Sequence, residues 1–402
     1  MKFQFLFSSL FFSIVTGQPQ GTQSSIPFKE NSDTKISQTL KSNWPSMHPC
    51  DSKTPITIRI AEKDFINISI NQILKNSEVV PLEYNQQSIL SDFATFLNDT
   101  TNYFLVDKHV KKKVYQFSLN GQFIRTIGQY GEGQGEYQHL TDALVTPGGI
   151  EILSSQHQSQ VFSYDKLGRF IESNQVLDRP AYSFIKDAEN GFYYFKSSSY
   201  QNIIQKVNVD LQLIDSSVTN NTKLVPSLIK AFSKSSSGPM LFYQPFDNRI
   251  FGVDRDSIRI RYRLDFGQWT PNYNELDQFG QQEIMGNGEF WVIYETLENS
   301  QWLYLLIAKQ VANNEALSKY YSLLYEKNTG KLYSLPDTPE PGSLFYPAFE
   351  LGENMVLYTA VSPAIISKYE EWISEFTKRS LTINPSGNLI VVKVPIKKLM
   401  ID

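Results

Sequence analysis

Three of the four histidines stand at intervals that could bring their imidazoles onto one surface. His109 and His157 precede Gly121 and Gly168, two glycines in matching turn sequences, at almost the same spacing, and His139 lies between the two stretches. Three imidazoles form a ligand set that suits Zn²⁺ or Cu²⁺. Histidines at hairpin tips are commonly just exposed polar residues, however, and spacing alone does not bring rings together. We therefore predict no metal site and no cofactor.

Two other features with reactive chemistry give no stronger signal. The segment 128–135, GQYGEGQG, is similar to a phosphate-binding loop, but such a loop opens a helix, and here a strand pattern follows. We expect its glycines to supply positive φ angles where the chain crosses between structural units. Cys50, the single cysteine, lies in a polar stretch without a neighbouring base, so we predict neither a disulfide nor a catalytic thiol.

Carboxylate pairs also favour structural explanations. Asp254 and Asp256 flank an expected hairpin turn, where aspartate bonds nearby backbone N–H groups, and Glu132 and Glu136 lie in the glycine-rich loop. The sequence contains no Gly-x-Ser-x-Gly or His-Glu-x-x-His motif. We predict no catalytic residues, leave the binding residues unassigned, and expect a binding protein more than an enzyme.

Composition narrows the class of protein. The 402 residues include 27 Phe, 22 Tyr and 5 Trp, and aromatic residues favour half-buried strands. The net charge is −4, and no basic stripe of the kind that binds nucleic acid is present. The chain is therefore predicted to be all-β, with no nucleic-acid partner.

The elements that must position these residues repeat along the chain. The stretches 114–137, VYQFSLNGQFIRTIGQYGEGQGEY, and 161–171, VFSYDKLGRFI, share a strand–turn–strand pattern. Several strands per unit at the period that separates them are typical of a β-propeller, and the length suits about six blades. We expect units at 89–130, 137–177, 180–217, 238–269, 283–336 and from 344 onward. In such a ring the three histidines would share one face.

The sixth unit is one strand short. An early strand, VVPLEY at 79–84, is spare, and we expect it to close the ring by completing the last blade, which leaves no open edge there. The same unit is interrupted by a predicted amphipathic helix at 363–379, because apolar residues recur every three or four positions. Its apolar stripe comprises Ile365, Ile366, Tyr369, Trp372, Ile373 and Phe376.

The N-terminus predicts export. Lys2, an apolar run at 3–15 and the small residue Gly17 match a signal peptide, with cleavage expected after Gly17. Gln18 follows where a lipoprotein would have cysteine, so there is no lipobox, and no later run is long enough for a transmembrane helix. We divide the chain into a signal peptide at 1–17, a flexible polar leader at 18–55 and a propeller domain at 56–402.

Taken together, these features resemble the secreted six-bladed β-propeller family of Bacteroidetes, relatives of NHL-repeat propellers. The stretches that carry the resemblance are VVPLEY (79–84), 114–137, FSYDKLGRFIES (162–173), YQPFDNRIFGVD (243–254), RYRLDFG (261–267) and NPSGNLIVVKV (384–394). The resemblance implies an extracytoplasmic location in a bacterium, whether periplasmic, at the cell surface or secreted. Many members are lipoproteins, a feature that the missing lipobox does not support here.

Our leading hypothesis is a monomeric binding or interaction module for an unknown protein, peptide or glycan ligand. A propeller presents a rigid face without a mobile catalytic element. The alternatives are a metal-dependent lyase or hydrolase at the channel mouth, since some NHL-type propellers hold a metal on histidines, and a structural component of the envelope.

Overall fold

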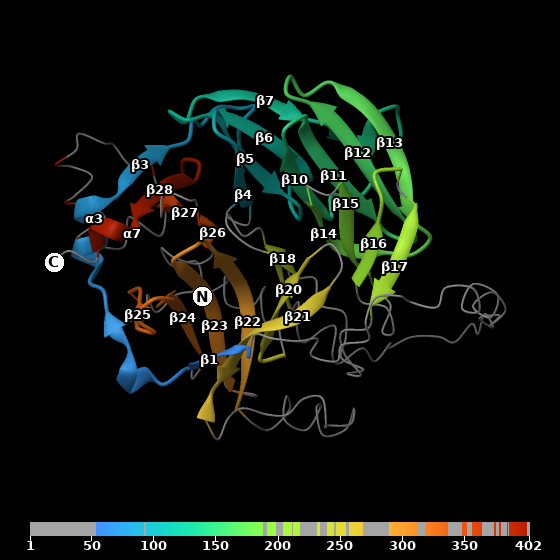
Figure 1. The fold of residues 1–402 in the computed structure, drawn as a ribbon. Coiled ribbons are helices and arrows are strands. Elements are labelled where there is room, and N and C mark those ends of the chain that lie inside the picture. Colours follow the sequence, from blue (N-terminus) through green and yellow to red (C-terminus); the bar gives the residue numbers. More distant parts are fainter. Residues whose placement is uncertain are drawn as a thin grey trace, which may run out of the picture.

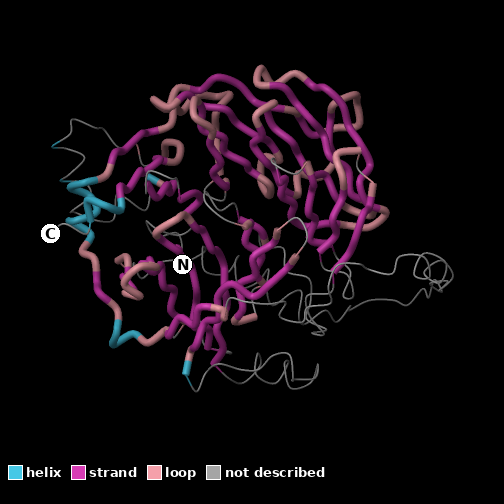
Figure 2. Tube along the Cα trace, viewed as in Figure 1, coloured by secondary structure: helices cyan, strands magenta, loops and turns pink. Residues whose placement is uncertain are grey.

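A computed structural model of the protein consists mainly of strands (Figure 2). It describes residues 54–402 except 92–93, 188–190, 198–203, 211, 218–230, 234–238, 245–246, 255–256, 268–288, 312–317, 337–347, 352–355, 364–373, 375–377, 379–383, 385 and 400–402. The expected signal peptide and nearly all of the leader lie outside the described residues. None of the helices in the described part of the chain is long and apolar enough to cross a membrane.

Six sheets stand around a ring, which confirms the predicted six-bladed β-propeller (Figure 1). The first three are four-stranded and antiparallel, with strands in chain order. Blade 1 comprises β4 (Thr95–Asn98), β5 (Asn102–Asp107), β6 (Lys113–Ser118) and β7 (Phe123–Ile127). Blade 2 comprises β10 (Asp142–Thr146), β11 (Gly149–Ser155), β12 (Ser159–Asp165) and β13 (Phe170–Leu177). Blade 3 comprises β14 (Ala181–Asp187), β15 (Phe192–Ser197), β16 (Ile204–Val207) and β17 (Leu213–Ser217).

The other three blades recruit strands from the N-terminal part of the chain. Blade 4 comprises β18 (Phe232–Ser233), β19 (Met240–Tyr243), β20 (Arg249–Val253), β21 (Ile258–Asp265) and β1 (Ile56–Arg59). Blade 5 comprises β22 (Glu289–Glu298), β23 (Trp302–Val311), β24 (Lys319–Glu326), β25 (Leu332–Ser334) and β2 (Ile66–Asn67). Blade 6 comprises β26 (Ala348–Leu351), β27 (Val356–Val361), β28 (Ile390–Pro395) and β3 (Glu78–Pro81).

The segment Ile56–Pro81 runs along the outer edges of three successive blades, and we call it the belt. Its β1 adds in parallel to β21, with Ile58 opposite Leu264, and its β2 adds in parallel to β25. Its β3 pairs antiparallel with β28 as the missing strand of blade 6, so the predicted ring closure is confirmed. In Figure 1 the blue β1 lies beside the yellow β21. The parallel fifth strands on blades 4 and 5 are not part of the sequence prediction.

Apolar side chains hold the belt to the ring. Ile58 and Ile60 belong to the core between blades 4 and 5, and Val80 and Leu82 belong to the core between blades 6 and 1. Between β2 and β3, a short helix, α3 (Ile70–Asn76), contacts the C-terminal helix α7 (Ile396–Leu399), as Figure 1 also shows. The C-terminal helix therefore contacts the belt beside blade 6.

Packing between blades explains why their inner strands are so apolar. Each blade faces a neighbour on both sides, so both faces of these strands need apolar residues. The first seven residues of β23, WLYLLIA, are all buried. Odd and even positions of β15 serve different interfaces: Tyr193 and Phe195 pack toward blade 2, and Tyr194 packs toward blade 4.

Gly121 of blade 1 lies against the end of the belt, where there is no room for a side chain. Gly121 has a φ of +85°, and a Cβ there would lie 2.2 Å from the carbonyl oxygen of Pro81. Its own carbonyl accepts a hydrogen bond of 2.7 Å from the backbone N–H of Glu83. The Asn120-Gly121 turn therefore both reverses the chain and lets the closing strand pass.

Some boundaries differ from the sequence prediction. Blade 4 begins at β18, before the expected start at residue 238, because its innermost strand has only two residues and gives no readable pattern. The glycine-rich loop forms a short parallel pair, β8 (Gln129–Tyr130) with β9 (Glu136–Tyr137), and no helix follows it. Pro363, Ser374 and Lys378 are helical, as the predicted helix at 363–379 requires, but its apolar stripe lies outside the described residues.

Candidate functional site

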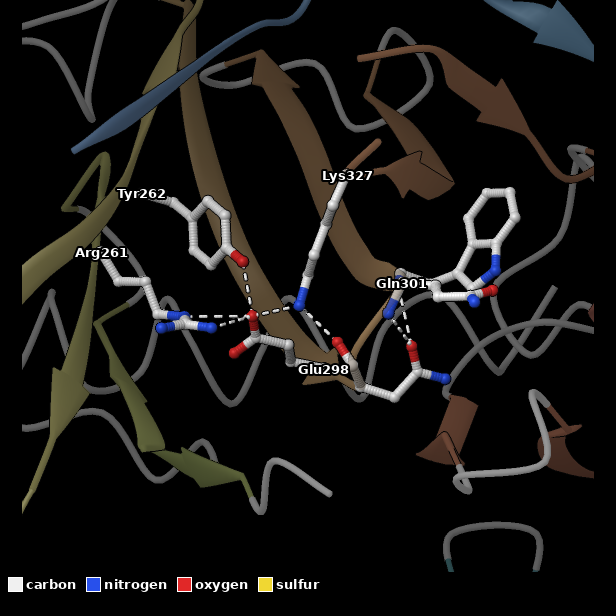
Figure 3. Close-up of polar contacts among 7 residues, drawn as sticks. Arg261, Tyr262, Glu298, Gln301 and Lys327 are labelled. Atoms are coloured by element: carbon white, nitrogen blue, oxygen red, sulfur yellow. Dashed lines mark hydrogen bonds and ion pairs between the residues drawn. The ribbon is translucent and has the colours of Figure 1, made fainter. Parts of the chain in front are cut away.

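One buried carboxylate collects several donors between blades 4 and 5. Glu298, the last residue of β22, has a side chain that is 0% exposed. Arg261 donates to its Oε1 from Nε and Nη2, at 3.0 and 2.7 Å, and the Tyr262 hydroxyl donates at 2.5 Å. Lys327, just after β24, also donates to Oε1 and to the carbonyl of Asn299. Figure 3 shows these side chains converging from two blades on Glu298.

Burial and charge set the protonation of this cluster. Burial, and then the charge of Glu298, raises the pKa of the Tyr262 hydroxyl, which therefore stays protonated and donates. Burial lowers the pKa of Lys327, although Glu298 opposes the change. Burial also disfavours the charged Arg261, but its hydrogen bond and attraction to Glu298 raise the net pKa. Two cations thus share one carboxylate.

The second oxygen of Glu298 has no hydrogen-bond partner among the described residues. Thr296, two positions earlier on the same strand, also has a buried hydroxyl without a partner there. The other oxygen of Glu298, Oε1, is already occupied by donors from Arg261, Tyr262 and Lys327. The cluster is therefore a buried network of ion pairs that joins blades 4 and 5. It does not have the arrangement of a catalytic dyad.

Similar ties link other blades. Glu151 of blade 2 accepts hydrogen bonds from Lys186 and Tyr193 of blade 3, at 2.8 and 2.9 Å. Burial raises the pKa of Tyr193 to about 12, so it remains a donor at neutral pH. Asp142 at the start of β10 accepts from Lys108 of blade 1 at 3.0 Å and from Ser183 of blade 3 at 3.0 Å. Buried charges with described partners therefore serve mainly to join neighbouring blades.

Lys196 is a buried cation on β15. Burial lowers its pKa to about 8, a value at which an amine can exchange protons near neutrality. The residue is only 4% exposed, so its amine is withdrawn from the surface where a substrate would arrive. We do not assign it a catalytic role.

The segments that carry the three histidines lie on the same face of the propeller, and side-chain hydrogen bonds connect them. A blade whose strands alternate in direction puts its second–third turn and the connection to the next blade on the same side of the ring. The Nε2–H of His139 donates a 2.8 Å hydrogen bond to the amide oxygen of Gln156, next to His157. Lys108, next to His109, donates to Asp142. His109 and His157 are exposed.

The rings themselves form no metal-ligating cluster. Among the described residues no group of three or more His, Cys, Asp or Glu side chains is placed to hold a metal ion. The pKa of His109 is lowered, mainly by desolvation and then by the charge of Lys108, and both favour the neutral form. Cys50 lies outside the described residues. Absence of a metal stays a prediction.

Sequence reasoning did not find the Glu298 cluster. Its members come from positions 261, 262, 298 and 327, and no short motif joins them. The available signal was a glutamate at the end of a long apolar strand, since such a carboxylate needs a cationic partner once buried. The partner could not be chosen without the arrangement of the blades.

Comparison with known proteins adds a family. The model of a domain of unknown function, DUF4934, matches residues 55–395, which covers the belt and all six blades. The chain belongs to the DUF4934 family. No curated protein matches this DUF4934 chain.

Solved structures include one with a similar fold. A Bacteroides fragilis protein, named as a candidate exported protein, superposes on this DUF4934 protein with a TM-score of 0.65. The two chains are 17% identical, and the match covers 85% of this chain and 99% of the other. At that identity the likeness shows the fold alone. A Bacteroides caccae protein of unknown function is 11% identical with a TM-score of 0.41, covering 65% of this chain and 99% of its own.

Proposed function

We propose that this protein is an exported binding module whose recognition surface is the face that carries His109, His139 and His157. The fold supports the proposal, because a closed ring with interlocked blades presents loops rigidly. The observation that carries the proposal is that side-chain hydrogen bonds connect three loops on that face. The contacts Lys108–Asp142 and His139–Gln156 unite the turns of blades 1 and 2 with the connection between them.

The chemistry of this surface suits a polar ligand with an apolar element. Besides the exposed imidazoles of His109 and His157, it presents Val110, which is 55% exposed and follows His109 in the sequence. Gln156 offers an amide, and imidazoles and amides both donate and accept hydrogen bonds. Exposed peptide and glycan surfaces combine polar groups with apolar patches, so we propose a protein, peptide or glycan ligand and a monomeric receptor.

Binding arrays test the assignment of the face. The mature protein would be applied to a glycan array and to a library of synthetic peptides, and the best binder would be titrated against variants. His109→Ala combined with Val110→Ser should weaken that binding at least about tenfold. The matched control, Leu167→Ser, changes an exposed residue at a third–fourth turn on the opposite face and should leave affinity unchanged. Equal affinity in all three proteins would reject the proposed face.

We also propose that residues 1–17 are a cleaved signal peptide, that the protein is extracytoplasmic, and that it is related to NHL-repeat propellers. The match to a candidate exported protein supports export. Fractionation of expressing cells followed by N-terminal sequencing should give a mature chain that begins near Gln18. A cytoplasmic chain that retains Met1 would contradict export.

A further inference from the structure

The turn between the second and third strands of blade 1 concentrates positive charge. It covers residues 108–113, on the face proposed for binding, and contains three consecutive lysines, Lys111, Lys112 and Lys113. Lys111 and Lys113 are exposed, and within the described part of the chain none of the three forms an ion pair. Lys393 of blade 6, in contrast, pairs with a glutamate at 2.7 Å. Because the whole chain has a net charge of −4, this turn reverses the sign of the charge locally.

The acidic residues around this turn are already occupied. Asp107, just before the turn, is buried, and its carboxylate accepts two backbone N–H groups of the turn itself. In the glycine-rich loop that adjoins the turn, Glu132 accepts a 2.9 Å hydrogen bond from the amide of Gln138. Glu136 accepts one of 2.9 Å from the backbone N–H of Gly133. These carboxylates therefore stabilise the turn and the loop and do not neutralise the lysines.

Lys112 has a backbone conformation that favours glycine. Its φ is +53°, and every other described residue with a positive φ is a glycine. A long side chain is strained at such an angle, whereas glycine is not. The hydroxyl of the buried Tyr137 donates a 3.1 Å hydrogen bond to the carbonyl of Lys112, which helps to hold this conformation. Strain of this kind is concentrated at functional sites, so a lysine in place of glycine indicates a use for its side chain.

An apolar group and an aromatic ring accompany the charges. Val110, within the turn, is 55% exposed, and Tyr130 of the glycine-rich loop is 56% exposed. The ammonium of Lys112 lies 4.7 Å from the centre of the Tyr130 ring, which joins the turn to the loop. A peptide with acidic and apolar side chains can pair with the lysines and also cover Val110. An acidic glycan can supply the carboxylates, but its hydroxyl groups gain nothing from contact with a valine.

We propose that the ligand of this face is an acidic protein segment, whose carboxylates pair with Lys111, Lys112 and Lys113 while an apolar side chain covers Val110 and Tyr130. This inference rests on the proposed function, because it uses the same face, and it adds the chemistry of the ligand. The lysines lie at the surface, so their attraction should speed association and should weaken as salt is added. The strained turn holds the charges in place before the ligand arrives, which lowers the cost of ordering them.

Fluorescence anisotropy with a labelled synthetic peptide, in which glutamates flank one leucine, tests this chemistry. The mature protein should bind the peptide, and the affinity should fall about tenfold or more between low and physiological salt. Lys111→Gln combined with Lys112→Gly should weaken binding at low salt at least about tenfold. A second peptide with glutamine in place of each glutamate should bind the wild type no better than it binds this variant.

The matched control removes two charges from the opposite face. Lys166→Gln combined with Lys331→Gln changes exposed lysines at third–fourth turns and should retain full affinity. Two single variants separate charge from structure. Lys112→Arg keeps the charge and should keep the affinity within about twofold. Lys112→Gly should lose affinity without a lower melting temperature, because glycine favours a positive φ. A lower melting temperature with unchanged binding would make Lys112 a structural residue and overturn the proposal.

Other results would overturn the proposal in ways that can be told apart. An oligogalacturonate of similar charge is the second probe, and if it bound as tightly as the glutamate peptide, the turn would be assigned to acidic glycans. If neither probe bound, the lysines would have no role in recognition. A ligand from the arrays that His109→Ala with Val110→Ser weakens, but that the lysine variants do not affect, would uphold the proposed face and refute the acidic ligand.

Discussion

At the scale of single residues, the interior charges act in groups. Glu298 pairs with two cations that come from different blades, and its removal leaves Arg261 and Lys327 without that shared carboxylate. Such a group is weak evidence for extra stability over an apolar core, but breaking it by removing one member is costly. The residues therefore matter through their partners.

Glu298→Gln should lower the free energy of unfolding by about 2–4 kcal/mol, since it leaves two partly buried cations without their counter-charge. Urea denaturation followed by tryptophan fluorescence would measure the change. Arg169→Ala is the control, because Arg169 pairs with Asp165 but its side chain is 74% exposed, and such surface pairs contribute about 0–1 kcal/mol. A loss for Glu298→Gln no larger than for the control would show that the cluster does not join the blades.

Lys196 should make stability depend on pH in the alkaline range. Its pKa is about 8 in the folded protein, against 10.5 for a free side chain. Between these values the unfolded chain binds a proton at this lysine that the folded chain does not, so the contribution of Lys196 to stability should become less unfavourable as pH increases from 8 to 10.5. Below pH 8 the full cost of burying the ammonium remains.

Lys196→Met should therefore stabilise the protein at pH 7 by about 1–3 kcal/mol, and this difference from the wild type should shrink as pH rises above 8. Thermal unfolding from neutral pH to about pH 10 would measure both effects. Arg259→Met, at an exposed side chain, controls for general loss of positive charge. A difference between Lys196→Met and the wild type that stayed constant from pH 7 to about pH 10 would contradict the lowered pKa of Lys196.

At the scale of elements, the hairpins and the closing strand β3 were predictable, and the parallel edge strands β1 and β2 were not. Blades 1–3 could be read because each strand pair is joined by a short turn, such as Asn120-Gly121, so that local sequence determines pairing. The two parallel strands of the belt have four and two residues, and their partners lie far along the chain. No local pattern identifies such a partner. For the candidate site, the order of strands and turns predicted which face of the propeller carries the three histidines. It did not predict how their imidazole rings lie relative to one another.

Within the belt, the contribution of each isoleucine to the free energy of unfolding should depend on how deeply its side chain is buried. Ile58 is 3% exposed in the core between blades 4 and 5, so Ile58→Ala should cost about 2–4 kcal/mol of unfolding free energy. Ile56 lies on the same strand but is 43% exposed, so Ile56→Ala should cost less than about 0.5 kcal/mol. Equal costs in denaturant titrations would mean that β1 is not docked as described.

At the scale of the whole molecule, six blades form one closed ring because β3, from the N-terminal part of the chain, pairs with β28, the last strand. Deleting residues 78–85 should open the edge of β28 and remove the contact of Glu83 with blade 1. Exposed edges promote association, so we expect aggregates by light scattering. Deleting residues 18–25, equal in number, should leave a soluble protein of unchanged melting temperature. A monomeric product of the first deletion with unchanged melting would refute closure by β3.

The belt also constrains the order in which a growing polypeptide can become native. Residues 78–81 are synthesised early, yet their partners, residues 390–393, are among the last to be made. Residues 56–59 likewise wait for residues 262–265. Contacts this distant in sequence slow folding, because the intervening chain must first be ordered. Blades 1–3 can form while the chain is being synthesised. The ring cannot close until β28 has been made, so the chain stays without its closing strand pair until translation is nearly complete. If the chain is transferred across a membrane during that time, it is transferred before the ring has closed.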